Sequence, residues 1–141
     1  MKNLNVEIEL VNQKVQFKAV SDAKPDRPIM MDYSPPLGDS QGFSGLELLL
    51  MSFCGCVSTT IIVLLRRTGK QVKSFRAVAS GIRQENPLSL IKVIFKVCIK
   101  SNDIESPDME KVLELASNVS PVWLTIKNNV EVMTEYEVLA N

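Results

Sequence analysis

Three cysteines, Cys54, Cys56 and Cys98, are the residues of this sequence best suited to chemistry. The sequence contains no histidine, which removes Cys–His and Ser–His pairs, histidine metal sites and histidine proton shuttles. Any chemistry must therefore use thiols, carboxylates, hydroxyls or the cations of lysine and arginine. A thiol reacts as its thiolate, and most buried thiols are inert packing groups. By residue type alone, each cysteine is more often structural than catalytic.

The spacing of Cys54 and Cys56 argues against a redox pair. Two residues on a helix are separated by about 200° of rotation, so the two Cβ vectors diverge. An intrahelical disulfide would need local unwinding. The same divergence disfavours a shared metal, so the sequence predicts no metal site and no cofactor. Cys98 lies in an apolar strand pattern and is predicted to fill the core.

The element that must position Cys56 is a long apolar helix over residues 44–67. Ser44 and Glu47 have the S-x-x-E spacing of a capping box. No charged residue occurs from Leu48 to Leu65, and two arginines and Gly69 close the helix. A helix that is apolar nearly all round is buried on every side. In so small a chain this predicts a dimer with the helix at the interface, and not a membrane span, because serines and threonines dilute its apolar run.

The rest of the chain predicts an α+β domain with antiparallel sheets. The pattern favours a hairpin of strands 4–10 and 14–20, and then a turn-rich connection over 21–43 around a short strand at 29–31. Strands at 72–83 and 89–100 follow the long helix. Ser106 is predicted to be the N-cap of a second helix, with Pro107 at its first position. A short helix at 122–126 and a strand at 130–138 complete one domain over 1–141, divided into 1–43, 44–67 and 70–141.

Composition narrows the functional classes. Sixteen basic and sixteen acidic residues cancel, and the Arg66-Arg67 pair is the largest basic cluster, so no nucleic-acid partner is expected. The segment from Met1 to Glu7 alternates polar and apolar residues and lacks the apolar region of a signal peptide. An odd number of cysteines disfavours a disulfide framework. These features predict a cytoplasmic protein.

The segment from Leu46 to Ser58, followed by Leu64-Leu65-Arg66-Arg67, resembles the central-helix signature of the OsmC/Ohr family, roughly S-P-x-E-L-L-L-A-S-L-x-G-C. The segment Ala116-x-x-x-Ser120-Pro121-Val122 is similar to the second signature, A-x-x-x-C-P-V. Pro87 between two strands and the closing strand near Tyr136 extend the resemblance over nearly the whole chain.

The resemblance implies an intertwined homodimer, with the long helices central and sheets around them. It also implies thiol chemistry, because family members with full motifs reduce organic hydroperoxides and serve in the oxidative stress response. There a peroxidatic cysteine becomes a sulfenic acid and condenses with a second cysteine. By this resemblance Cys56 occupies the nucleophile position and Ser120 stands at the position of the second cysteine.

The sequence departs from the family pattern at several positions. Ser120 cannot form the family's intramolecular disulfide. Leu46 occupies the place of the catalytic glutamate, and Gly45 replaces the proline before the motif. The family's peroxidase arginine comes from the N-terminal region, where Arg27 is the single candidate. Cys56 lies twelve residues after Ser44, so the helix dipole stabilises its thiolate little.

Two hypotheses follow. In the first, the protein is a one-cysteine redox enzyme: Cys56 reacts with a hydroperoxide, an external thiol reductant resolves it, and Ser120 donates a hydrogen bond to the sulfur or the leaving oxygen. In the second, it is a catalytically lapsed family member that binds a small apolar ligand or serves as a structural homodimer. Five apolar residues either line a cavity for such a ligand or form ordinary core: Met30, Met31, Met51, Phe53 and Trp123.

Overall fold

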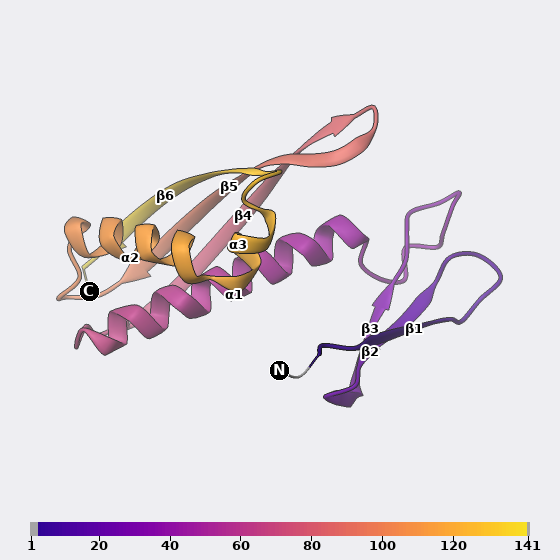
Figure 1. Ribbon diagram of the computed structural model, residues 1–141, viewed down its shortest axis with the longest axis horizontal. Coiled ribbons are helices and arrows are strands. Elements are labelled where there is room, and N and C mark those ends of the chain that lie inside the picture. The colour runs from indigo at the N-terminus through magenta and orange to yellow at the C-terminus, as the bar shows by residue number, and fades with distance from the viewer. Residues whose placement is uncertain (1–2, 141) are drawn as a thin grey trace. The chain divides into compact units, whose positions relative to one another are not determined.

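The computed structural model describes residues 3–140, so residues 1–2 and 141 of the predicted domain lie outside the described residues. The chain has an α+β fold, as predicted (Figure 1). It divides into two compact units, Met1–Leu48 and Leu49–Asn141, and each is described by itself. The prediction of a single domain over 1–141 stays a prediction. The elements are β1 (Val6–Leu10), β2 (Phe17–Ser21), β3 (Lys24–Met31), α1 (Gly45–Arg67), β4 (Ser74–Glu85), β5 (Leu88–Lys100), α2 (Ser106–Val119), α3 (Pro121–Ile126) and β6 (Glu131–Leu139).

The first unit is built on an antiparallel sheet in the order β1-β2-β3. The predicted hairpin of β1 and β2 is confirmed. The strand predicted at 29–31 is present but longer than predicted, because β3 begins at Lys24 and runs through Pro25 and Pro28. Proline cannot donate to a ladder, but β3 lies at the edge of this sheet, where a missing donor is tolerated.

A loop that follows β3 is organised by one buried carboxylate. Asp32 accepts backbone N–H bonds from Tyr33 at 2.8 Å, Asp39 at 3.2 Å and Gln41 at 3.0 Å. The bond from Gln41 is the main cause that lowers the pKa of Asp32, burial opposes it, and Lys14 adds a favourable charge. These bonds tie the loop between β3 and α1 to the charged form of one side chain.

The long helix begins and ends as its sequence predicts. The Ser44 N–H donates to Glu47 Oε1 at 3.0 Å, and the Glu47 N–H donates to Ser44 Oγ at 3.2 Å, which completes the capping box. At the other end Gly69 has φ of 81°, and the Lys70 N–H donates to the Leu65 carbonyl at 3.0 Å. The left-handed glycine satisfies carbonyls that the helix leaves free.

The second unit contains a mixed sheet in the order β4-β5-β6. β4 and β5 are antiparallel, but β5 and β6 are parallel, with Lys92 opposite Glu131 and Lys100 opposite Leu139. The prediction of purely antiparallel sheets is therefore wrong at this pair. α2 and α3 connect β5 to β6, and a helical crossover returns the chain to the starting end of the sheet, so the next strand runs parallel.

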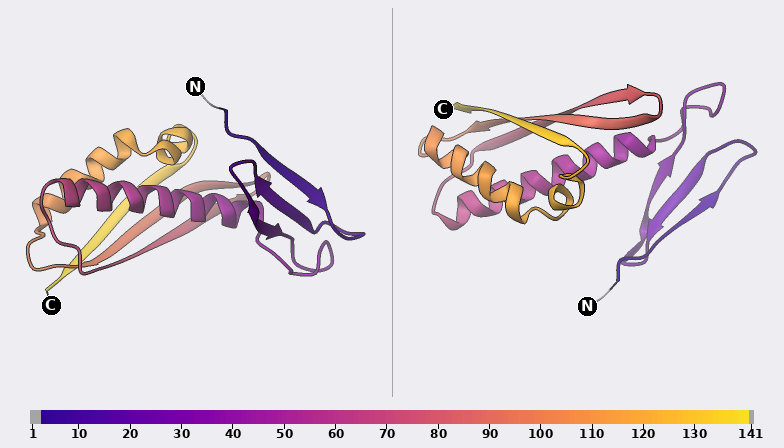
Figure 2. Two further views of the ribbon diagram at one scale, coloured as in Figure 1. Left: turned by 90° about the horizontal axis from the view of Figure 1, so that it is seen from below. Right: turned by 45° about the horizontal axis from the view of Figure 1, so that its top comes forward.

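The core of the second unit lies between this sheet and its helices. β5 presents alternate residues to the core, and Val93, Phe95, Val97 and Ile99 are fully buried. α1 contributes one buried residue in each turn: Phe53, Val57, Ile61 and Leu65. Figures 1 and 2 show α1 and α2 on the same face of the sheet.

Gly81 on β4 sets how closely α1 approaches the sheet. A Cβ atom at this position would lie 2.9 Å from Leu50 of α1 and 2.6 Å from Leu90 of β5. The absence of a side chain at Gly81 therefore lets the helix pack tightly on the strands.

α1 is long and apolar enough to cross a membrane by length and composition, but only 22% of its most apolar window is buried within the chain. The buried part is a single face that packs on the sheet of its own unit. α1 is thus a core helix of this unit rather than a clear membrane span. The opposite face includes Met51, which is 48% exposed.

The N-terminus of α2 differs from its prediction by one residue. Glu105, and not Ser106, is the N-cap. The Glu105 N–H donates to Asp108 Oδ2 at 2.9 Å, so the carboxylate three residues on closes the cap one position earlier. Pro107 lies in the first turn, where its missing donor costs nothing.

Candidate redox site

Cys56 is held on α1 one turn after Phe53, whose ring fixes the helix against its neighbours. The Phe53 ring is fully buried and meets Phe95 of β5 edge-on, with a centroid distance of 5.7 Å and an angle of 89°. It also contacts Trp123 of α3 at 5.6 Å and 62°. Such edge-to-face contacts are specific in geometry as well as apolar. Phe53 therefore joins α1, α3 and the sheet beside Cys56.

Ser120 occupies the junction of α2 and α3. Its N–H donates to the Ala116 carbonyl at 2.9 Å, which ends α2, and its carbonyl accepts from the Leu124 N–H at 2.9 Å, which begins α3. Pro121 then stands at the first position of α3 and stops α2 from continuing. Because Ser120 belongs to both caps, its backbone is fixed. Its side chain is fully buried.

The fold brings the two residues of the sequence prediction into contact. Cys56 Sγ and Ser120 Oγ lie 3.3 Å apart, within hydrogen-bond distance for sulfur, and either atom can donate. Cys56 is half-buried. Among residues 3–140, the Ser120 hydroxyl has no other hydrogen-bond partner. A buried hydroxyl with one partner is oriented by it, so Ser120 is aimed at the sulfur of Cys56.

The hydrogen bond between Cys56 and Ser120 can form in either protonation state of the cysteine. When Cys56 is a thiol, its S–H can donate to the Ser120 oxygen. When Cys56 is a thiolate, the Ser120 O–H can donate to the sulfur and compensate part of the charge.

The other two cysteines do not join the site. Cys54, Cys56 and Cys98 are free thiols in the structure. Burial raises the pKa of Cys54, and a hydrogen bond from Ser58 partly opposes this. A raised pKa keeps Cys54 in its less reactive thiol form near neutral pH.

The prediction that Cys98 fills the core is wrong. Cys98 is half-buried and lies in β5 between the fully buried Val97 and Ile99. Successive strand residues point to opposite faces, so Cys98 lies on the face of the sheet away from the helices. Its register partners there are Arg76 and Glu137. The alternation of side chains along a strand places Cys98 on the outer face. The sequence did not reveal this alternation because β5 is apolar on both faces.

Phe53 and Trp123, two of the residues predicted to line a cavity or to form core, lie together in the core of the second unit. Met30 and Met31 lie on β3 in the first unit, so the cavity that would join all five stays a prediction. Arg27 also lies on β3, and its role as a thiolate partner likewise stays a prediction.

Glu47 has a structural role, and the described carboxylates do not gather into a metal site. Glu47 is occupied by the cap of α1, as its spacing predicts. Among residues 3–140, no three metal-ligating side chains of histidine, cysteine, aspartate or glutamate come together. The double cap at Ser120 was missed from the sequence, although Pro121 beside a small polar residue is the signal that could have indicated it.

Comparisons with known proteins agree with this fold. The family model described as OsmC-like protein matches residues 38–135, a range that holds both Cys56 and Ser120. The chain belongs to the OsmC/Ohr family of redox and hydroperoxide-resistance proteins, and the resemblance found in the sequence is confirmed. No curated protein matches the sequence.

Solved structures show the same fold at low sequence identity. A hypothetical protein from Aquifex aeolicus VF5 is 21% identical, with a TM-score of 0.84, over 100% of this chain and 99% of that chain. An OsmC-like protein from Mycoplasma pneumoniae is 17% identical, with a TM-score of 0.83, over 98% of both chains. An organic hydroperoxide resistance protein OsmC from Legionella pneumophila is 12% identical, with a TM-score of 0.77, over 97% of this chain and 98% of that chain.

Proposed function

We propose that this protein is a one-cysteine thiol redox enzyme in which Cys56 reduces a hydroperoxide and an external thiol restores it. The observation that carries the proposal is the 3.3 Å contact between Cys56 Sγ and the buried Ser120 Oγ. The family assignment supports the substrate class, since the Legionella pneumophila relative is an organic hydroperoxide resistance protein.

The proposed reaction has three balanced steps. The Cys56 thiolate attacks the terminal peroxide oxygen, the O–O bond breaks, and the alkoxide takes a proton from water and leaves as an alcohol. The product is a sulfenic acid on Cys56. An external thiol then attacks this sulfur and releases water, and a second external thiol cleaves the mixed disulfide, so that the external thiols end as a disulfide and Cys56 as a thiol.

Ser120 is the positioning and hydrogen-bonding group of this scheme. Its hydroxyl donates to the thiolate before the attack and remains beside the sulfenic oxygen afterwards. A serine hydroxyl cannot form a disulfide with Cys56, so an external thiol must reduce the sulfenic acid. This difference explains how a family member without the second cysteine keeps a complete catalytic cycle.

The active form is a homodimer. In the first unit, Val6, Ile8 and Ile29 share one face of the sheet with Phe17 and are 77%, 54% and 46% exposed. The outer face of α1 also carries the exposed Met51 and Val63. Exposed apolar faces of this extent mark surfaces that pack on a partner. The proposed location of the dimer is the cytoplasm, where reduced thiols are abundant.

Sulfenic acid trapping tests the proposed function directly. The purified protein is treated with cumene hydroperoxide and dimedone, and the adduct is located by peptide mass spectrometry. The adduct is expected on Cys56 and lost in Cys56→Ser, while Cys54→Ser is the matched control that keeps it. Recovery of the free thiol should require an added thiol. A Cys56 that stays unmodified until the protein is denatured would contradict the proposal.

A crosslink tests the shared geometry. In Ser120→Cys, peroxide should join the introduced thiol to Cys56 in a disulfide, seen as a linked peptide pair without reductant. Ser117→Cys, one turn earlier on α2, is the control and should not crosslink.

A lapsed member that binds a small apolar ligand or serves as a structural homodimer is the second candidate. Leu46 at the place of the family's catalytic glutamate favours it. An unreactive Cys56 in a stable dimer would select this candidate.

A further inference from the structure

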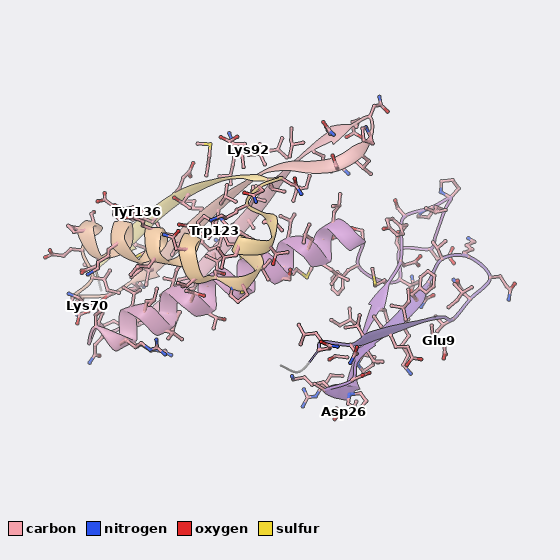
Figure 3. The ribbon with its side chains drawn as sticks, viewed as in Figure 1. Glu9, Asp26, Lys70, Lys92, Trp123 and Tyr136 are labelled. Carbon is pink, nitrogen blue, oxygen red and sulfur yellow. The ribbon has the colours of Figure 1, made fainter. Side chains whose placement is uncertain are left out.

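A groove separate from Cys56 runs between α2 and the edge strand β6 in the second unit. It has a volume of about 340 Å³. Its floor includes Leu113 and Trp123, and Glu110 and Glu114 stand on the α2 side. Thr134 and Tyr136 line it from β6. Figure 3 labels Trp123 of α3 and Tyr136 of β6, two of the residues that line the groove.

β6 is paired on one side only. In the sheet order β4-β5-β6 its neighbour is β5, and no described strand lies on its other side. In a parallel ladder the N–H and C=O groups of every second residue point away from the neighbour. β6 therefore presents unpaired backbone groups along nine residues, beside the groove. An edge strand next to a helix-lined groove is the geometry in which extended peptides bind by strand addition.

The charge of this edge selects its partner. Tyr136 Oη donates to Glu110 Oε1 at 3.2 Å, but within residues 3–140 no cation pairs with Glu110 or Glu114. β6 itself carries Glu131, Glu135 and Glu137 on the opposite face. Two copies of such an edge would repel one another, because like charges opposite each other are destabilising. A basic segment would meet attraction in the groove.

We propose that the groove between α2 and β6 binds an extended basic segment of a partner protein, which adds to the sheet as a strand beside β6. Its groove-side residues are lysine or arginine, whose methylene stems lie on Leu113 and Trp123 while the cationic heads reach Glu110 and Glu114. Its other face carries apolar residues beside Met133, which is 43% exposed. The proposal is independent of the Cys56 chemistry.

The full-length protein reports this binding without a label, because Trp123 is its single tryptophan. The probe is an acetylated peptide of alternating lysine and valine, nine residues long like β6. Saturable change in Trp123 emission is expected, together with backbone amide shifts in β6 by heteronuclear NMR. A glutamate–valine peptide of the same length should not bind.

Charge reversal separates the groove from general attraction. Glu114→Lys should weaken binding about tenfold, because an attraction and its reversal together amount to about 1.4 kcal/mol. Glu85→Lys makes the same charge change at the end of β4, on the far edge of the sheet, and should change affinity less than twofold. Equal loss in both variants would overturn the proposal.

The backbone contribution has its own test. A lysine–valine peptide with N-methyl groups on alternate residues keeps its charge. When the methyl groups fall on the residues whose N–H groups face β6, the peptide cannot donate hydrogen bonds to that strand. One of the two alternate methylation patterns should lose at least tenfold in affinity, and the other should not. Equal binding of both patterns, amide shifts confined to other elements, or no saturable binding would each overturn strand addition in this groove.

Discussion

The two three-stranded sheets of this protein differ in what covers them. The sheet β4-β5-β6 buries Val93, Phe95, Val97 and Ile99 beneath the helices of its own unit. Among the described residues of its unit, the sheet β1-β2-β3 has only the first turn of α1 as helix, and its alternating apolar residues Val6, Ile8 and Ile29 are exposed. The sheet β4-β5-β6 therefore has a hydrophobic core within its own unit. The sheet β1-β2-β3 leaves apolar side chains that a partner surface could cover. The difference teaches that the candidate redox site lies in the unit that covers its own sheet, whereas the homodimer proposal rests on the unit whose sheet is exposed.

The largest expected effect is the loss of an anchor in the covered unit. Phe53→Ala removes the ring between Phe95 and Trp123 and should destabilise the protein by about 3–5 kcal/mol, because it leaves a cavity in a dry core. Ile8→Ala in the sheet β1-β2-β3 should lower the unfolding free energy of the monomer far less, because Ile8 is exposed there. Urea unfolding measures both. If both variants lost the same unfolding free energy at every protein concentration, the two sheets would not differ in how they are covered.

A charge on the exposed sheet should act on association. Ile8→Asp places a carboxylate on the proposed dimer face and should weaken the dimer about a hundredfold, or about 2.7 kcal/mol. Sedimentation velocity over a dilution series measures the shift toward monomer. Glu7→Asp, on the other face of the same strand, is the control. A variant that stays dimeric at all concentrations would show that this sheet is not the interface.

A smaller effect is expected at the junction of α2 and α3. Ser120→Ala removes a buried hydrogen bond to Cys56 and should cost about 1 kcal/mol of folding stability. It should also slow the formation of the sulfenic acid on Cys56 by cumene hydroperoxide, because the thiolate loses a hydrogen-bond donor. A time course of dimedone trapping at one pH measures this rate. An unchanged rate would leave Ser120 a packing residue.

The smallest effect is confined to acid and to the first unit. The native pKa of Asp32 is lowered from its ordinary value of 3.8, mainly by the Gln41 N–H bond. The charged form thus stabilises the fold above the unfolded pKa, and this stability is lost as the pH falls through the native pKa. Urea midpoints should fall more steeply below about pH 4 in the wild type than in Asp32→Asn. Parallel curves would contradict the role of this carboxylate.

Local signals in the sequence predicted the elements that depend on local interactions. The Ser44–Glu47 spacing gave α1 its start, and Gly69 its end, because caps involve residues only a few positions apart. The motif resemblance placed Cys56 and Ser120 as partners. Errors arose where the outcome depended on distant neighbours. β3 tolerates its prolines because it lies at the edge of its sheet. Cys98 lies on the face of its sheet opposite to α1 and α2.

The sequence by itself determined the family, the class of fold, the long helix and the identity of the two residues of the candidate site. The tertiary structure alone decided that Cys56 Sγ and Ser120 Oγ lie 3.3 Å apart, that β6 runs parallel to β5, and that a groove opens along the free edge of β6. The physical reason is that sixty-four positions separate Cys56 from Ser120. Their distance is set by the packing of Phe53, Phe95 and Trp123, which no local pattern of residues encodes.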